Sequence, residues 1–195
     1  MVIEMKSVVI ASAARTPIGS FGGGLSRISA PKLGSQVISE VLKRAHVNPQ
    51  DVSEVIMGSV LTAGMGQAPA RQASLFAKIP DSVPCVTIGK VCGSGLKSIA
   101  IARQAIQCGE ADIVVAGGME NMSAAHHILE KLRGGYRLGH DQISDSMIKD
   151  GLWDVYHQFH MGHAAELLVK KYAFPRKEQD DYAIESYHRA IRAQK

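Results

Sequence analysis

The sequence predicts a layered α/β fold with a largely parallel sheet. Short apolar runs alternate with helical patterns up to residue 118, and segments rich in glycine and proline separate them. Strands that alternate with helices pair in parallel, and the connecting helices then cover the faces of the sheet. The chain has 195 residues, of which 46% are hydrophobic. It is therefore long enough to bury a core of this kind.

The four predicted strands are short apolar runs. The first of them, residues 7–14, is rich in β-branched residues and lacks polar alternation. This pattern is typical of strands that are buried on both faces. The last run is followed by Gly117 and Gly118, which we expect to close it. The predicted strands cover residues 7–14, 54–60, 84–91 and 112–116.

Three helices are predicted between these strands. The first follows Ser29, a possible N-cap, and has Pro31 in its first turn. A short helix is expected at residues 69–77, and a helix with little charge at residues 94–108. The first helix carries one apolar stripe, which consists of Leu33, Val37, Ile38, Val41, Leu42 and Ala45.

The chain changes character at residue 119. Mixed polar and glycine-containing segments lead to predicted helices at about residues 163–171 and 176–192, and no strand is evident there. We therefore predict an α/β core at residues 1–118 and a mostly helical loop subdomain at residues 119–195. The last helical pattern has no C-cap, so we expect that this chain is a truncated form of a longer protein.

Composition excludes several classes of protein. The net charge of +4 is dispersed and only 5% of residues are aromatic, which disfavours binding to nucleic acid. The apolar run at residues 8–14 is too short to span a membrane or to form a signal sequence. The three cysteines lack the spacing of a zinc site and cannot all pair. We expect reduced thiols, a cytoplasmic protein, and no metal.

Cys92 is the candidate nucleophile. In I-G-K-V-C-G-S-G-L-K-S-I, a predicted strand turns through Cys92 directly into a helix. Glycines permit so tight a turn, and the helix N-terminus stabilises a thiolate, the nucleophilic form of cysteine. The alternative is a small buried cysteine that fills a crowded turn. Cys85 and Cys108 are interpreted as core residues.

Six motifs, in the same order along the chain, resemble the thiolase family, with the best likeness to its acetyl-CoA acetyltransferase branch. They cover essentially the whole chain, which corresponds to the N-terminal half of a thiolase. The motifs are R-T-P-I-G-S-F-G-G (residues 15–23), P-A-R-Q-A (69–73), V-C-G-S-G-L (91–96), A-G-G-M-E-N-M-S (116–123), D-G-L-W-D (150–154) and H-M-G (160–162).

The resemblance implies the roles of several residues. Cys92 would accept an acetyl group from acetyl-CoA, which a second acetyl-CoA attacks to give acetoacetyl-CoA; thiolysis is the reverse. Leu152 and His160 would contact the pantetheine arm, and Met161 would line the acyl pocket. Residues 124–140 would join subunits of a homo-oligomer, a dimer or tetramer. Coenzyme A enters as a thioester substrate, and no cofactor is implied.

The resemblance also implies that three catalytic groups lie in the other half of a thiolase: a histidine base, a second cysteine and an asparagine that holds a water. Gly89 departs from the family, which usually has asparagine or another small polar residue there. Basic residues at Arg133, Arg137 and His140 are candidates for phosphate contacts, or simply solvated. Two other functions are considered: a catalytically silent thiolase-like fragment that associates with other chains, and a condensing enzyme that uses acyl carriers. The H-M-G and G-G-M-E-N-M-S motifs speak against the last.

Overall fold

The computed structural model describes residues 7–195. Its backbone packing separates two compact units, one ending at Gly151 and the other comprising Leu152–Lys195. Each unit is described by itself. Packing thus places residues 119–151 with the first unit. The division at residue 118, which rests on the change in sequence character there, stays a prediction.

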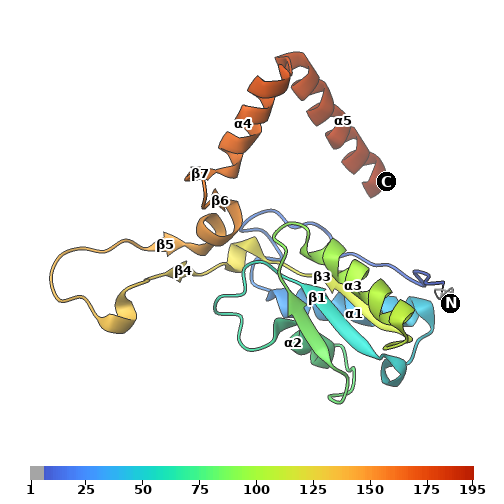
Figure 1. Ribbon diagram of the computed structural model, residues 1–195. Helices are drawn as coiled ribbons and strands as arrows, with labels where there is room; N and C mark the ends of the chain where they lie inside the picture. Colours follow the sequence, from blue (N-terminus) through green and yellow to red (C-terminus); the bar gives the residue numbers. More distant parts are fainter. Residues whose placement is uncertain (1–6) are drawn as a thin grey trace, which may run out of the picture. The chain divides into compact units, whose positions relative to one another are not determined.

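A parallel three-stranded sheet forms the centre of the first unit (Figure 1). Its strands are β1 (Glu54–Gly58), β2 (Cys85–Ile88) and β3 (Val114–Gly118), in the order β2-β1-β3. The central strand pairs in parallel with both neighbours, and Val55, Ile56 and Met57 on it are at most 1% exposed. Three of the four predicted strands and the parallel arrangement are thereby confirmed.

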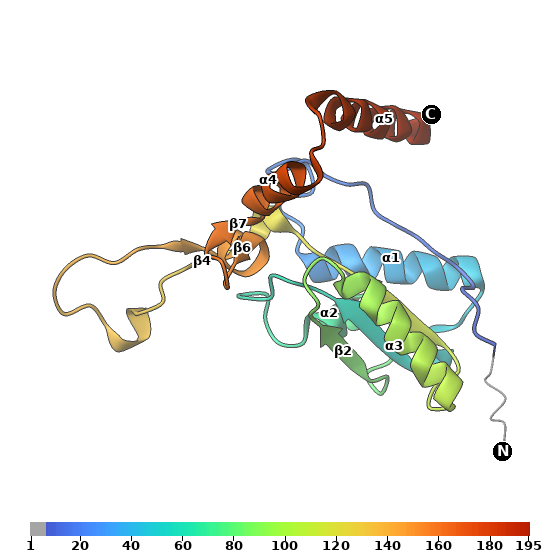
Figure 2. The same ribbon diagram turned by 45° about the horizontal axis from the view of Figure 1, so that its top comes forward.

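Helices cover both faces of this sheet (Figure 2). The helix α3 (Ser94–Cys108) contacts β1 and β3, while α2 (Pro69–Phe76) contacts β1 and β2. The helix α1 (Ala30–Ala45) packs on α2. The apolar core on the α1/α2 side includes Val55 and Met57 of β1. Because strand side chains alternate between faces, Ile56 lies on the opposite face.

The helix α1 begins as predicted, but Ser29 makes no side-chain capping hydrogen bond. Pro31 instead provides a backbone that is already suited to the first turn. The helix ends at His46, whose left-handed backbone lets its N–H reach the Lys43 carbonyl at 3.2 Å. Its most buried positions form a stripe of Ala30, Pro31, Gly34, Ser35, Ile38 and Leu42, while Leu33 and Val37 are half-buried.

The predicted strand at residues 7–14 does not form. This segment has no regular secondary structure, and Val9 and Ile10 are 79% and 78% exposed. A β-strand requires a neighbour that accepts and donates its backbone hydrogen bonds. Among residues 7–195 the sheet contains only β1, β2 and β3. The prediction was wrong because composition indicates which residues suit a strand but supplies no partner.

Hydrogen exchange should distinguish this segment from the sheet. We expect backbone amides of residues 8–14 to exchange about 100-fold faster, or more, than those of β1, because protection follows stable hydrogen bonding. Amide exchange followed by NMR or mass spectrometry measures this directly. Equal protection of the two segments would show that residues 8–14 are paired in solution.

All three strands differ from their predicted bounds, and β1 ends at Gly58, two residues earlier than predicted. The strand β2 ends at Ile88, because the chain then enters the turn that precedes α3. The strand β3 begins at Val114 and includes Gly117 and Gly118, which were expected to close it. These glycines do not break the strand because their partners in β1 hold them in register, with Gly58 opposite Gly118.

The remainder of the first unit consists of short elements. A 3-10 turn η1 (Pro49–Asp51) precedes β1, and η2 (Met122–Ala124) follows β3. An extended arm is built from β4 (His127–Ile128), which pairs antiparallel with β5 (Ser144–Asp145), and from the 3-10 turn η3 (Leu132–Gly134) between them. A π-helical segment η4 (Met147–Leu152) follows, and its last residue, Leu152, is the first of the second unit.

The second unit contains a hairpin and two helices. The hairpin pairs β6 (Trp153–Asp154) with β7 (Phe159–His160). The helices α4 (Met161–Tyr172) and α5 (Arg176–Gln194) confirm the two helices predicted near the end of the chain. The expectation that this part of the chain contributes almost no strand is confirmed, because each of the four additional strands is only two residues long. In residues 7–195, no helix combines the length and apolarity needed to cross a membrane.

Candidate active site

Cys92 lies in the turn that connects β2 to α3, two residues before the helix begins. The Gly93 N–H donates to the Lys90 carbonyl at 3.0 Å, and the Ser94 N–H donates to the Val91 carbonyl at 3.1 Å. Two overlapping turns therefore reverse the chain within a few residues. The Cys92 side chain is exposed. The predicted passage from strand through cysteine into helix is confirmed.

Val91 carries the strain of this turn. Its φ angle is +46°, in the left-handed region, which costs a non-glycine residue about 1–2 kcal/mol. A β-branched residue is rare in this conformation, and strained backbone of this kind clusters at functional sites because the surrounding structure must hold it there.

Ser94 supplies part of that support. Its hydroxyl donates to the Val91 carbonyl at 2.6 Å and accepts from the Lys90 N–H at 2.7 Å. Ser94 is buried, and the next helical hydrogen bond runs from the Lys97 N–H to the Gly93 carbonyl at 2.9 Å. The Ser94 hydroxyl, two residues after Cys92, thus holds the two residues that precede it, Lys90 and Val91.

Glycines allow the start of α3 to lie directly on the sheet. A Cβ atom on Gly58 of β1 would be 2.5 Å from the Ser94 carbonyl carbon. Gly95 of α3 faces Gly118 of β3, where a Cβ would be 3.2 Å from the Gly95 Cα. Contact this close between backbones is possible only without side chains. The carboxyl ends of β1 and β3 therefore support the helix terminus beside Cys92.

The buried hydroxyl group of Ser98 connects α3 to β3 by a hydrogen bond. Ser98, which is 0% exposed, has its hydroxyl 2.6 Å from the Gly95 carbonyl and 2.8 Å from the Gly117 carbonyl. Because a hydroxyl has one proton to donate, the two carbonyls share it, and the buried donor is satisfied. Helix and strand are thereby held in a fixed relative position next to the site.

The three cysteines occupy different environments. Cys85 is half-buried and packs against the core, as predicted. Cys108 was also predicted to be a core residue, but it is exposed. It is the last residue of α3 before Gly109, whose left-handed backbone ends the helix at the surface. The alternative of a buried, space-filling Cys92 does not agree with its exposure.

The two exposed thiols lie at opposite ends of one helix and so provide an internal control. A helix dipole favours an anion at its N-terminus and disfavours one at its C-terminus. We expect iodoacetamide to alkylate Cys92 about tenfold faster than Cys108 near neutral pH, with Cys85 slowest, because the thiolate is the reacting form. Peptide mapping over time gives the three rates. Equal rates at Cys92 and Cys108 would contradict the role assigned to the helix terminus.

The other predicted site residues belong to the second unit. Leu152 ends the π-helical segment and is half-buried, whereas His160 and Met161 are exposed. His160 is the N-cap of α4, and its ring Nδ1 accepts the Gly162 N–H at 3.0 Å. With Nδ1 used as an acceptor, the neutral ring carries its proton on Nε2. The structure thus brings His160 and Met161 together at one helix terminus.

Two residues of the A-G-G-M-E-N-M-S motif have contacts that the sequence interpretation missed. The Glu120 carboxylate accepts the Val60 N–H at 2.7 Å. The Asn121 amide donates to the carbonyls of Ser26 at 3.1 Å and Ile28 at 2.7 Å. Through these hydrogen bonds, the segment that follows β3 is held against the loop after β1 and the loop before α1. The motif could have indicated these contacts, because carboxylate and amide side chains that follow a strand can form hydrogen bonds with the backbone of nearby loops.

A pocket in the first unit lies apart from Cys92. The loop from Arg15 to Phe21 lines it, together with Leu25, Ser26, Leu33, Glu120, Asn121, Met122, Ser123 and Met147. Cys92 is not among the lining residues. The candidate nucleophile therefore lies on an exposed turn, outside this pocket. In residues 7–195, no group of three or more histidine, cysteine or acidic residues is arranged to hold a metal ion.

The predicted oligomerisation segment is exposed. Arg133, Arg137 and His140 all lie in the arm between β4 and β5 and are open to solvent. Lys149 pairs with Glu130 at the base of this arm. Lys131 lies 3.7 Å from Asp141. These ion pairs stabilise the arm. Phosphate binding by its basic residues and association of subunits through it stay predictions.

The comparison with protein families agrees with this geometry. The family described as thiolase, N-terminal domain, matches residues 8–195. The chain belongs to the thiolase family. A thiolase of Ascaris suum, Acat5, solved in complex with coenzyme A, has the same fold, with a TM-score of 0.91, 46% identity, and coverage of 94% of this chain and 48% of that one. The expected thiolase-like layered fold is confirmed.

Curated thiolase relatives are similar over nearly the whole chain. The acetyl-CoA acetyltransferase of Cupriavidus necator is 57% identical over 98% of this chain and 49% of its own length. Acetyl-CoA acetyltransferase 2 of Arabidopsis thaliana is 53% identical over 98% of this chain and 48% of its own. The chain therefore spans about half the length of the curated thiolases that it matches.

Proposed function

We propose that this chain supplies the nucleophilic half of a thiolase that forms or cleaves acetoacetyl-CoA. The observation that carries the proposal is an exposed cysteine, Cys92, held on a strained turn at the N-terminus of α3. Its relatives are named acetyl-CoA acetyltransferases, which supports acetyl-CoA as the substrate. The alternative is a catalytically silent chain that acts only by association.

The proposed chemistry begins with acyl transfer to Cys92. The thiolate attacks the carbonyl carbon of acetyl-CoA, so that a new thioester bond forms at Sγ and the bond to the coenzyme A sulfur breaks. The proton that leaves the Cys92 thiol ends on the coenzyme A thiolate. A base then takes a proton from the methyl group of a second acetyl-CoA, and the resulting carbanion attacks the carbonyl carbon of the acetyl-cysteine. The bond from that carbon to Sγ breaks, acetoacetyl-CoA is released, and the proton taken by the base ends on Sγ to regenerate the thiol.

The proposed substrate contacts come from the second unit. Leu152 and His160 would contact the pantetheine arm, and Met161 would contribute an adaptable thioether to the acyl pocket. The position of His160 and Met161 at the start of α4 supports a paired role, since one element presents both. The proposed location is the cytoplasm, where cysteines are ordinarily kept as reduced thiols.

Self-association through the arm is part of the same proposal. Several of its apolar side chains are exposed, and Leu138 is fully so. Exposed apolar groups that gather in one segment mark interaction sites. They are Leu132 at 55%, Leu138 at 100% and Ile143 at 65% exposed. A second copy of the chain is the partner that the homo-oligomer proposal names.

Acetyl transfer to Cys92 tests the proposed function. The chain is incubated with acetyl-CoA, and intact mass followed by peptide mapping locates any added acetyl group. We expect slow, stoichiometric labelling at Cys92 that Cys92→Ser abolishes and Cys108→Ser leaves unchanged. Labelling spread equally over Cys92 and Cys108, or no labelling at all, would favour the silent alternative.

A further inference from the structure

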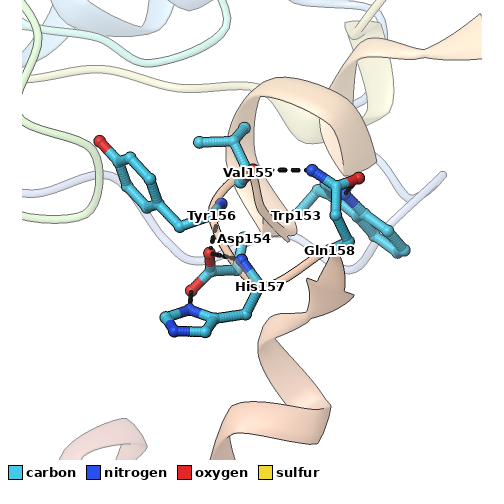
Figure 3. A network of polar contacts seen from close by, with 6 residues as sticks. All are labelled: Trp153, Asp154, Val155, Tyr156, His157 and Gln158. Carbon is cyan, nitrogen blue, oxygen red and sulfur yellow. Dashed lines mark hydrogen bonds and ion pairs between the residues drawn. The ribbon is translucent and has the colours of Figure 1, made fainter.

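We propose that Asp154 is a positioning residue for His160 and Met161. The inference rests on the proposed function, which places these two residues against the coenzyme A substrate. It adds a residue that acts through the hairpin preceding α4, and this hairpin is shown in Figure 3.

The hairpin itself is too short to fix its own register. The strands β6 and β7 have two residues each, with Trp153 opposite His160 and Asp154 opposite Phe159. Isolated two-stranded hairpins are marginal in water even when they are longer. The register that orients His160 must therefore come from contacts in the connecting turn.

Asp154 makes most of those contacts. One carboxylate oxygen accepts the Tyr156 N–H at 2.8 Å and the His157 N–H at 3.0 Å (Figure 3). The other lies 3.4 Å from Nδ1 of His157. The backbone carbonyl of Asp154 also accepts the Gln158 N–H at 2.9 Å. The side chain of Asp154 is 21% exposed, against 71% for that of His157. Asp154 is therefore largely shielded from solvent and accepts most of the hydrogen bonds within the turn.

The turn needs such support because its last residue is strained. Gln158 has a φ angle of +59°, in the left-handed region that is unfavourable for residues other than glycine. Its amide nitrogen donates to the Val155 carbonyl at 2.7 Å, and its amide oxygen accepts from the Trp153 indole at 3.4 Å. These bonds join Gln158 to Val155 and Trp153, whereas the Asp154 side chain binds Tyr156 and His157 (Figure 3).

The turn is linked to the proposed substrate residues in two ways, by the backbone and by contacts between side-chain rings. Along the backbone, His160 ends β7 and caps α4, and Met161 follows at once. Through side chains, the Phe159 ring lies 5.6 Å from that of His157 and 6.1 Å from that of His163 on α4. A slip of one residue in a strand pair turns each side chain to the other face. Loss of the Asp154 contacts would therefore misplace His160.

The charge of Asp154 suits this role at neutral pH. The N–H groups of His157 and Tyr156 stabilise the carboxylate and hold the pKa of Asp154 below its usual value. The stabilisation is present above the ordinary pKa of an aspartate and is lost as the pH falls through the lowered one. In the neutral range both oxygens are acceptors, as the turn requires.

The experiment compares three variants of the chain: Asp154→Ala, Asp154→Asn and Asp180→Ala. Asp180 is a matched control, because it pairs with Arg176 within α5 of the same unit. NMR follows the His160 ring and Met161 methyl resonances, and coenzyme A is then titrated. We expect Asp154→Ala to shift both resonances and to weaken coenzyme A binding about tenfold, because several charge-assisted hydrogen bonds are lost. Asp154→Asn, which retains an acceptor oxygen, should keep most of the coenzyme A affinity and should leave both resonances close to their original positions.

The outcomes separate this inference from the proposed function. If coenzyme A does not bind to the unaltered chain, the proposed substrate contacts fail, while the resonance shifts still decide the role of Asp154. Unmoved His160 and Met161 resonances in Asp154→Ala would overturn the positioning role. Equal shifts throughout α4 and α5 would also overturn it, since they would indicate general unfolding. Asp180→Ala should leave both resonances and the binding unchanged.

Discussion

Replacement of Gly58 with valine should destabilise the first unit by about 3 kcal/mol or more, at the upper end of the range for overpacked cores. The cause is steric, because even one added carbon at Gly58 would lie 2.5 Å from the Ser94 carbonyl carbon and 2.7 Å from the Gly95 nitrogen. These are backbone atoms and cannot rotate away as a flexible side chain does. The helix α3 must move off the sheet, and Cys92 moves with it.

Urea denaturation followed by circular dichroism measures this loss. Gly24→Val is the matched control, because Gly24 is an exposed turn residue with no atom within 4 Å of an added Cβ. We expect that variant to change stability by less than about 0.5 kcal/mol, as is usual for surface sites. The Gly58 variant should also lose the faster alkylation of Cys92. Equal stability of the two variants would show that α3 can shift without cost.

The core of the fold was predictable because local signals agree with packing there. The strand β1 contains the apolar run of residues 55–57, and it became a central strand whose last four residues are buried. The turn at Cys92 was predictable for the same reason, since its glycines and the following helical pattern leave few alternatives. What composition could not indicate is that Gly58, on a different strand, provides the surface on which this turn rests.

The predictions that failed required information that the sequence of a single segment does not contain. Residues 7–14 have strand composition but no strand neighbour among the described residues. Cys108 has the character of a core residue, yet the helix ends at the surface beside it. The hairpin around Asp154 was missed because its stability comes from polar contacts within one turn, and an apolar periodicity does not reveal them.

Residues 1–195 as a separate protein should show no detectable thiolysis of acetoacetyl-CoA. The resemblance to thiolases implies that the histidine base and the second cysteine are in the half of the family that this chain does not span, and the matched relatives are about twice as long. Catalytic groups that act as a unit are strongly non-additive, so that loss of the base alone costs about four or more orders of magnitude in rate.

The measurement is the disappearance of acetoacetyl-CoA in the presence of coenzyme A, with a full-length thiolase as the positive control and mass spectrometry to exclude contamination by it. Slow acetylation of Cys92 is compatible with this result, because that exchange requires only a thiolate and a thioester. Robust turnover by the pure chain would contradict it and would mean that residues within this chain have taken over the missing roles. His160, His163 and Cys108 would then be the first to replace, since all three are exposed and each carries a group capable of proton transfer.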